Sequence, residues 1–230
     1  MSKIKLKHAS GNSMSIEAPA TNPASDLALK LPATIGTAGQ VLKNSSTAGT
    51  LEFGSAGGDY VKLATESSGT DVSTIVHDSI DFSVYRALNF IGAVIPTSDN
   101  QPFNFYWRSG GADCVADTYF TGYHRAIPSD TEDTEAEFNQ GRLQLCGNTG
   151  NADSQGFYFN IFMFPFASGD ENNMGNFITW SGMHRDGSGN YRGIQGAGRY
   201  MTDVTPDGFK FQAHSGDIDH YNYSLYGIKR

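Results

Sequence analysis

Residues Phe157 to Phe166 have the sequence FYFNIFMFPF, in which nearly every position is large and apolar. Side chains alternate between the two faces of a strand, so this stretch predicts a strand with two apolar faces. One face carries Phe157, Phe159, Ile161, Met163 and Pro165, and the other carries Tyr158, Asn160, Phe162, Phe164 and Phe166. Pro165 has no N–H to donate, which suits a strand end or an edge.

Both faces of this strand need cover. One face can fill the core between the two sheets of a β-sandwich. The other face then meets either a further part of the same domain or another copy of the chain. For the second alternative we predict a subunit interface formed by Tyr158, Phe162, Phe164 and Phe166.

The composition around this strand favours an all-β protein. The chain has 230 residues, of which 17% are charged and 12% aromatic, and it contains 27 glycines. Low charge with many glycines and aromatics is typical of strands joined by tight turns. The formal net charge of −8 argues against nucleic-acid binding, which needs an excess of Lys and Arg to neutralise phosphates.

Cysteines and apolar runs indicate neither a metal motif nor a membrane segment. Cys114 and Cys146 are the only cysteines and form no CxxC. We expect two free buried thiols, and a disulfide stays open if the fold brings the two residues together. No apolar run is long enough to span a bilayer, so we expect no membrane insertion.

The first residues predict a hairpin. Residues 2–8 alternate Lys with Ile4 and Leu6, and Met14 and Ile16 predict a partner strand. Gly11-Asn12 between them is a turn signal.

After this hairpin the composition shifts. From Pro32 to Gly58 the sequence is rich in Gly, Ser, Thr and Ala, with too few large side chains for a core of its own. We therefore expect residues 1–57 to be an assembly or anchoring arm that another chain, or another copy, holds in place.

Residues 58–230 predict the body of the protein. Short alternating runs are separated by turn clusters such as SGGAD and RDGSGN. About eight to ten strands at this spacing favour an antiparallel β-sandwich of jelly-roll type. The one expected helical turn is SDTEDTEAEF, Ser129 to Phe138, where Ser129 followed by Glu132 fits a capping box.

Motifs for catalysis are weak. The same stretch holds five acids, Asp130, Glu132, Asp133, Glu135 and Glu137. Glycoside hydrolysis needs two such carboxyls facing a sugar, but closely spaced like charges favour a solvated loop. The RDGSGN loop is either a turn or a short calcium loop, and it lacks the full EF-hand pattern. We expect no catalytic residues, no cofactor and no metal site.

Aromatic residues that alternate with polar ones are candidates for surface binding. Such rings stack on sugars, although they also fill sheet faces and interfaces. The candidates are Tyr106, Tyr123, Trp180 and Tyr191.

Two segments resemble a known class of proteins. Residues 27–54, LALKLPATIGTAGQVLKNSSTAGTLEFG, resemble the LPxxxGTxGQVL…GxLxF/W segment of tail-fibre and other virion proteins of tailed phages, most familiar in marine and cyanobacterial phages. The last residues, YSLYGIKR, are similar to the closing strand of β-sandwich head domains in such proteins. The middle of the chain carries no such resemblance.

The resemblance implies a virion structural protein of the fibre or knob type, assembled in the host bacterial cytoplasm. It implies a homotrimer whose residues 1–57 contact other virion proteins and whose sandwich contacts a host-surface glycan or protein. Two alternatives stay open: a capsid decoration, cement or tail-adaptor protein, and a glycan depolymerase.

Overall fold

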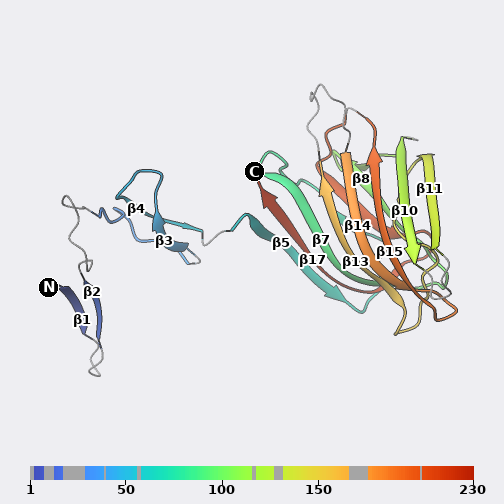
Figure 1. Cartoon of the computed structure of the whole chain (residues 1–230), viewed down its shortest axis with the longest axis horizontal. Coiled ribbons are helices and arrows are strands. Elements are labelled where there is room, and N and C mark those ends of the chain that lie inside the picture. The colour runs from blue at the N-terminus through green and yellow to red at the C-terminus, as the bar shows by residue number, and fades with distance from the viewer. Residues whose placement is uncertain are drawn as a thin grey trace. The chain divides into compact units, whose positions relative to one another are not determined.

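The computed structural model describes residues 3–7, 13–17, 29–38, 40–55, 58–115, 118–126, 132–165, 176–202 and 204–230. The chain divides into two compact units, Met1–Gly57 and Gly58–Arg230. The division falls where the Gly- and Ser-rich composition ends. All regular elements of the described residues are β-strands, most of which are labelled in Figure 1.

The first unit contains two hairpins. Strands β1 (Lys3–Lys7) and β2 (Ser13–Glu17) pair antiparallel, with Ile4 opposite Ile16 and Leu6 opposite Met14. This confirms the predicted first hairpin, although its Gly11-Asn12 turn lies outside the described residues. Strands β3 (Gln40–Asn44) and β4 (Leu51–Ser55) form a second hairpin that the composition did not predict.

The second unit contains a large sheet of eight strands in the order β11-β10-β15-β14-β13-β7-β17-β5, all of them antiparallel neighbours (Figure 1). Its strands are β5 (Tyr60–Ser68), β7 (Tyr85–Pro96), β10 (Tyr119–Ala126), β11 (Glu132–Gln140), β13 (Gly156–Phe164), β14 (Asn176–Arg185), β15 (Tyr191–Tyr200) and β17 (Ile218–Lys229). Strand β13, the FYFNIFMF segment, is therefore an inner strand of this sheet, and Pro165 directly follows its end.

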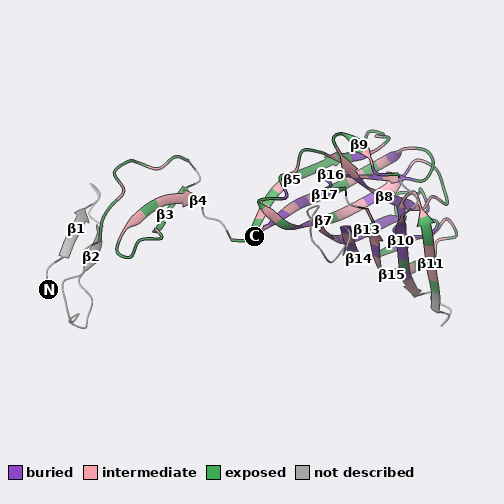
Figure 2. Cartoon of the chain, turned by 90° about the horizontal axis from the view of Figure 1, so that it is seen from above, coloured by how far each residue is buried: buried purple, intermediate pink, exposed green. Residues whose placement is uncertain are grey.

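A small sheet of five strands, also antiparallel, covers one face of the large sheet. Its strands are β6 (Ile75–His77), β8 (Phe103–Ser109), β9 (Ala112–Asp113), β12 (Leu143–Gln144) and β16 (Gly208–Ala213). The expected all-β antiparallel sandwich is confirmed, whereas this strand order does not establish the jelly-roll connectivity. Figure 2 shows buried residues in the middle of the sandwich and exposed ones along the edge strands β5 and β11.

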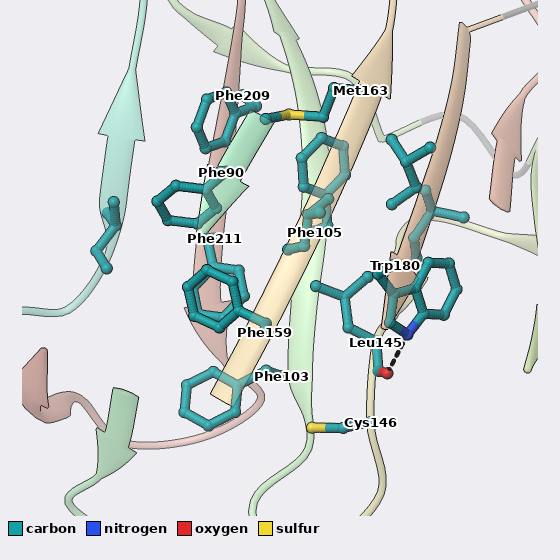
Figure 3. Close-up of a cluster of buried hydrophobic side chains, with 14 of the residues drawn as sticks. Phe90, Phe103, Phe105, Leu145, Cys146, Phe159, Met163, Trp180, Phe209 and Phe211 are labelled. Carbon is teal, nitrogen blue, oxygen red and sulfur yellow. Dashed lines mark hydrogen bonds between the residues drawn. The ribbon is translucent and has the colours of Figure 1, made fainter. Parts of the chain in front are cut away.

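The core lies between the two sheets and is largely aromatic (Figure 3). On the inner face of β13, Phe157, Phe159, Ile161 and Met163 are all buried, as the alternation predicted. Phe159 packs against Phe211 of the small sheet, with ring centroids 5.1 Å apart. Each fully buried Phe contributes about 1.5–3 kcal/mol of transfer free energy, so this layer is a main source of stability.

Glycines in β15 make room for large inner side chains. A Cβ on Gly196 would lie 2.2 Å from the indole of Trp180, and one on Gly198 would lie 2.6 Å from the side chain of Leu143. The Gly-rich segment NYRGIQGAGRYM is therefore a strand whose inner face lacks side chains where side chains of neighbouring strands need the space. Glycine in a strand often marks a bulge or a close neighbouring backbone, but here the close neighbours are the side chains of Trp180 and Leu143.

The predicted helical turn at Ser129 to Phe138 is wrong. Residues Glu132–Gln140 form β11, which pairs antiparallel with β10. Pairing with β10 satisfies the backbone groups on one side of this acidic segment, and Phe138 lies opposite Phe120 with ring centroids 5.8 Å apart. Tertiary pairing thus outweighs the local capping-box signal.

The two cysteines behave as expected. Cys114 and Cys146 are both free and buried. Burial raises the pKa of the Cys146 thiol to about 12.

Candidate functional site

The face of the large sheet that points away from the core, called the outer face below, is the candidate functional surface. Tyr158 lies on it with 49% of its surface exposed, and Phe162 and Phe164 lie on it half-buried. These are three of the four residues predicted for a subunit interface, and Phe166 lies outside the described residues. Their position opposite the core follows the predicted alternation, and their role as an interface stays a prediction.

Strand register places two pairs of aromatic side chains in one row of the outer face, with Arg199 of β15 between them, opposite both Phe177 and Phe120. Phe164 lies opposite Phe177, with ring centroids 6.3 Å apart, and Phe120 lies opposite Phe138. At the opposite edge of the sheet, Tyr60 of β5 lies opposite Ile228 of β17. We call the aromatic residues of this row the aromatic stripe, and its members are Tyr60, Phe120, Phe138, Phe164 and Phe177, whereas Ile228 is buried. Single-sequence reasoning missed most of it, because register between strands far apart in the chain is not visible in local alternation.

The middle of the outer face is polar but uncharged. Asn160 lies opposite Ser181, and Ser181 lies opposite Gln195. Asn89, a buried neighbour on β7, donates its side-chain amide to the Asn160 carbonyl oxygen at 2.5 Å. Such uncharged hydrogen-bonding groups cost less to cover than ionic ones.

A cleft of about 510 Å³ lies at the Tyr158 end of the outer face. Its lining includes Ser67, Ala93, Tyr158, His220 and Asn222. Its volume falls within the usual range for small-molecule sites, about 300–1,000 Å³.

A second cavity, of about 590 Å³, lies near the other end of β13, next to Pro165. Its lining includes three charged side chains, those of Asp81, Asp207 and Arg230. The two cavities therefore differ in the chemistry that they offer a ligand.

The four aromatics predicted for surface binding do not form one platform. Tyr191 is 51% exposed, and the guanidinium of Arg185 lies over its ring at 5.1 Å from the centroid. Tyr106 is half-buried on the small sheet, with the Lys210 ammonium 4.2 Å from its ring centroid.

The prediction is wrong for Tyr123 and Trp180. Both are buried, with Trp180 only 2% exposed, because their positions in β10 and β14 face the small sheet. Trp180 donates its indole N–H to the Leu145 carbonyl, and the Tyr123 hydroxyl donates to Glu135 and accepts from Gln144. Polar neighbours in sequence indicated exposure, but those neighbours occupy the other face.

The acidic cluster is not a solvated loop. Glu135 lies on β11, accepts the Tyr123 hydroxyl proton in a hydrogen bond, and is 3.4 Å from the guanidinium of Arg125. Asp130 and the side chains of Glu132 and Asp133 lie outside the described residues. Among described residues, no group of three or more His, Cys, Asp or Glu is placed to hold a metal ion.

The RDGSGN segment is a turn between β14 and β15. The Asp186 carboxylate accepts the backbone N–H of Asn190 and pairs with Arg192 at 2.6 Å. These hydrogen bonds and the guanidinium lower the pKa of Asp186, although burial alone raises it. The carboxylate is thus engaged by the protein itself, which favours the turn over the calcium loop.

A buried histidine was missed by the sequence reasoning. His184 is fully buried on the inner face of β14, opposite Phe157. Desolvation, followed by the nearby Arg192 and Arg125, lowers its pKa to about 4. Its spacing of two from Gly182 and four from Trp180 places it on the same strand face, which was the available signal.

Comparison with family models, with curated proteins and with solved structures finds no match for this chain. The described residues contain no helix that is long and apolar enough to cross a membrane.

Proposed function

We propose that this chain is a structural protein of a tailed-phage virion, of the fibre or knob type. Residues 1–57 attach it to other virion proteins, and the sandwich, of jelly-roll type, is presented to the host surface. The observation that carries the proposal is the LPATIGTAGQVL…GTLEFG segment of the first unit, with its resemblance to phage virion proteins. We propose no enzymatic activity for it.

The side chains of the first unit support an anchoring role. Ile35 is 93% exposed, and four further large apolar side chains are also exposed: Leu29, Leu31, Val41 and Leu42. Fully burying one such side chain gains about 1.5–3 kcal/mol. A partner that covers them therefore gains a large part of its binding free energy from this short segment.

The aromatic stripe supports contact between copies of the sandwich. Aromatic residues and Arg are enriched at protein interfaces, and the outer face carries the pairs Phe164–Phe177 and Phe120–Phe138 with Arg199 between them. We propose that the copies associate through the outer face as a homotrimer, with Phe162 and Phe164 in the contact.

The same exposed apolar groups favour one alternative, a capsid decoration, cement or tail-adaptor protein. In that case the sandwich contacts other virion proteins instead of a host. The two functions differ in one measurable property, because only the fibre or knob binds intact host cells.

Immunogold electron microscopy tests the proposal directly. Antibodies raised against residues 58–230 should label purified virions of the phage that encodes the chain, at tail or head fibres. Labelling over the whole capsid surface would favour the decoration protein, and unlabelled virions that lack the chain by mass spectrometry would overturn both.

Light scattering on a sizing column measures the mass of the full chain and of residues 58–230. The two masses show which unit carries the contact between copies. If both are trimers, the sandwich carries the contact and the arm is left for the virion. If only the full chain is trimeric, the arm is the assembly element. Two monomers would contradict the homotrimer and favour the decoration protein.

A further inference from the structure

The cleft at the Tyr158 end has a shape set by strand register. Asn222 of β17 lies opposite Ala93 of β7, and Ala93 lies opposite Tyr158 of β13. Neighbouring strands are about 4.8 Å apart, so Asn222 and Tyr158 flank Ala93 with about 10 Å between their strands. The small Ala93 methyl between two larger side chains leaves a trough on the outer face.

Two glycines keep the next part of the trough open. Gly156 has a φ of 149°, which other residues rarely adopt, and a Cβ there would lie 2.7 Å from the Val94 carbonyl oxygen. A Cβ on Gly69 would lie 3.1 Å from Nε2 of His220, so the imidazole ring lies against this glycine. No side chain therefore fills the cleft at these two glycines, and the His220 ring borders it.

The lining offers uncharged hydrogen-bonding groups beside an exposed ring. Ser67 brings a hydroxyl, Asn222 a side-chain amide, and Tyr158 both a phenol ring and a hydroxyl. None of these three side chains hydrogen-bonds to another residue in the part of the chain that the structure describes. No Lys, Arg, Asp or Glu lines the cleft, in contrast to the cavity near Pro165 with its two Asp and one Arg.

These features select a class of ligand. A charged ligand finds no Lys, Arg, Asp or Glu in the lining as a counter-charge, and the imidazole of His220 already lies 3.0 Å from the Asp219 carboxylate. A purely apolar ligand would cover the Asn222 amide and the hydroxyls without replacing their bonds to water, which is costly. A neutral saccharide presents both a C–H face for an aromatic ring and hydroxyls for amide and hydroxyl partners.

We propose that this cleft binds a neutral saccharide. One sugar ring lies over Ala93 with its C–H face against Tyr158, and its hydroxyls bond to Asn222 and Ser67. This deepens the proposed function and rests on it in one respect, because it makes a host-surface glycan the ligand of the sandwich. It also divides the outer face: the saccharide lies at the Tyr158 end, the subunit contact lies at Phe162 and the aromatic stripe, and Tyr158 is no longer part of the proposed interface.

Saturation-transfer NMR on the full chain tests the cleft. The probes are maltotriose, cellotriose, mannotriose, lactotriose and triacetylchitotriose, each at millimolar concentration. We expect at least one of these sugars to receive saturation transfer from the protein. Titration then measures the affinity of that sugar. No transfer to any of the five would overturn the proposal.

Four variants locate the binding. Tyr158→Ala removes the ring, Asn222→Ala removes the amide, and Ala93→Trp fills the trough from its floor. Each should weaken the bound sugar about tenfold or more, which corresponds to about 1.4 kcal/mol. Tyr191→Ala is the matched control, because Tyr191 is as exposed as Tyr158 but does not line the cleft.

The variants must keep their fold, which circular dichroism and thermal melting establish. Ala93→Trp adds a large side chain and can lower the melting temperature. If it does, Asn222→Ala decides whether the cleft binds the sugar, because Asn222 is exposed and its truncation should leave the fold intact. Binding that survives both Tyr158→Ala and Asn222→Ala would overturn the cleft as the site. That outcome would overturn the saccharide site but not the proposed virion role, which virion labelling tests separately. Unlabelled virions would overturn the virion role, and sugar binding could still be measured.

Discussion

Trp180 and Leu145 connect the two sheets. The indole Nε1 of Trp180, on β14 of the large sheet, donates to the carbonyl oxygen of Leu145 at 2.7 Å (Figure 3). Leu145 follows β12 of the small sheet, and its own N–H donates to the Phe103 carbonyl at 2.8 Å. Because Trp180 and Leu145 are both buried, loss of the bond leaves a carbonyl without a partner in a dry environment.

Trp180→Phe should therefore lower the free energy of unfolding. The lost hydrogen bond and the orphaned carbonyl together cost about 1–3 kcal/mol. Urea denaturation followed by far-ultraviolet circular dichroism measures the change. Tyr191→Phe, an exposed position, should unfold like the wild type, and an equal effect of both variants would contradict the role of the bond.

Gly196→Ala should destabilise the sandwich where Gly193→Ala does not. An added Cβ at Gly196 meets the Trp180 indole at 2.2 Å, whereas at Gly193 the nearest atom is the Ala126 Cβ at 3.9 Å. Overpacking of a well-packed core costs about 1–3 kcal/mol. Both variants lie on β15, so a comparison of their urea midpoints removes general effects of Gly→Ala in a strand.

The stability should fall as the pH drops from about 6.5 to about 4. His184 has its pKa lowered from 6.5 to about 4 in the folded chain, mainly by burial and then by Arg192 and Arg125. Between these values the unfolded chain binds the proton and the folded chain does not, so acid favours unfolding, by about 3 kcal/mol at the lower end. Above pH 6.5 this group should have no effect.

His184→Gln tests this assignment, because it removes the titrating ring. Urea unfolding at pH 7, 5.5 and 4.5 should show a smaller decrease for the variant than for the wild type. The carboxylates contribute equally to both proteins, so the difference between the slopes belongs to His184. Identical slopes would show that the ring is accessible to protons in the folded state.

The two thiols should react slowly with Ellman's reagent until the chain unfolds. The thiolate is the reactive form, and burial raises the pKa of Cys146 to about 12 and also raises that of Cys114. Both thiols should then react together in denaturant. Fast reaction of one thiol in native buffer would reveal local opening around that cysteine.

Phe162→Asp should dissociate the oligomer that we propose. A carboxylate at this half-buried position on the outer face would be desolvated in the contact between copies. Light scattering measures the mass, and Val76→Asp is the control, since it places the same charge on exposed β6 of the small sheet. An assembled Phe162→Asp variant with unchanged melting would place the contact elsewhere.

The sequence by itself determined many of the strands and which residues of β13 share a face, but not β3 and β4, nor β11, for which it predicted a helical turn. Phe157, Phe159, Ile161 and Met163 are buried as alternation requires, because the period of two in a strand is a local property of the backbone. The first hairpin and the two free thiols also followed from local pattern and spacing.

Only the tertiary structure decided which strands become neighbours and what covers each face. Trp180 and Tyr123 alternate with polar residues just as exposed aromatics do, and only the small sheet above them makes them core residues. The acidic residues 132–140 became a strand because β10 offered its edge, against the helix signal of the segment itself. The aromatic stripe and the Tyr158 cleft both depend on register between strands far apart in the chain. That register is set by the packing of the whole sandwich, which no local stretch of sequence contains.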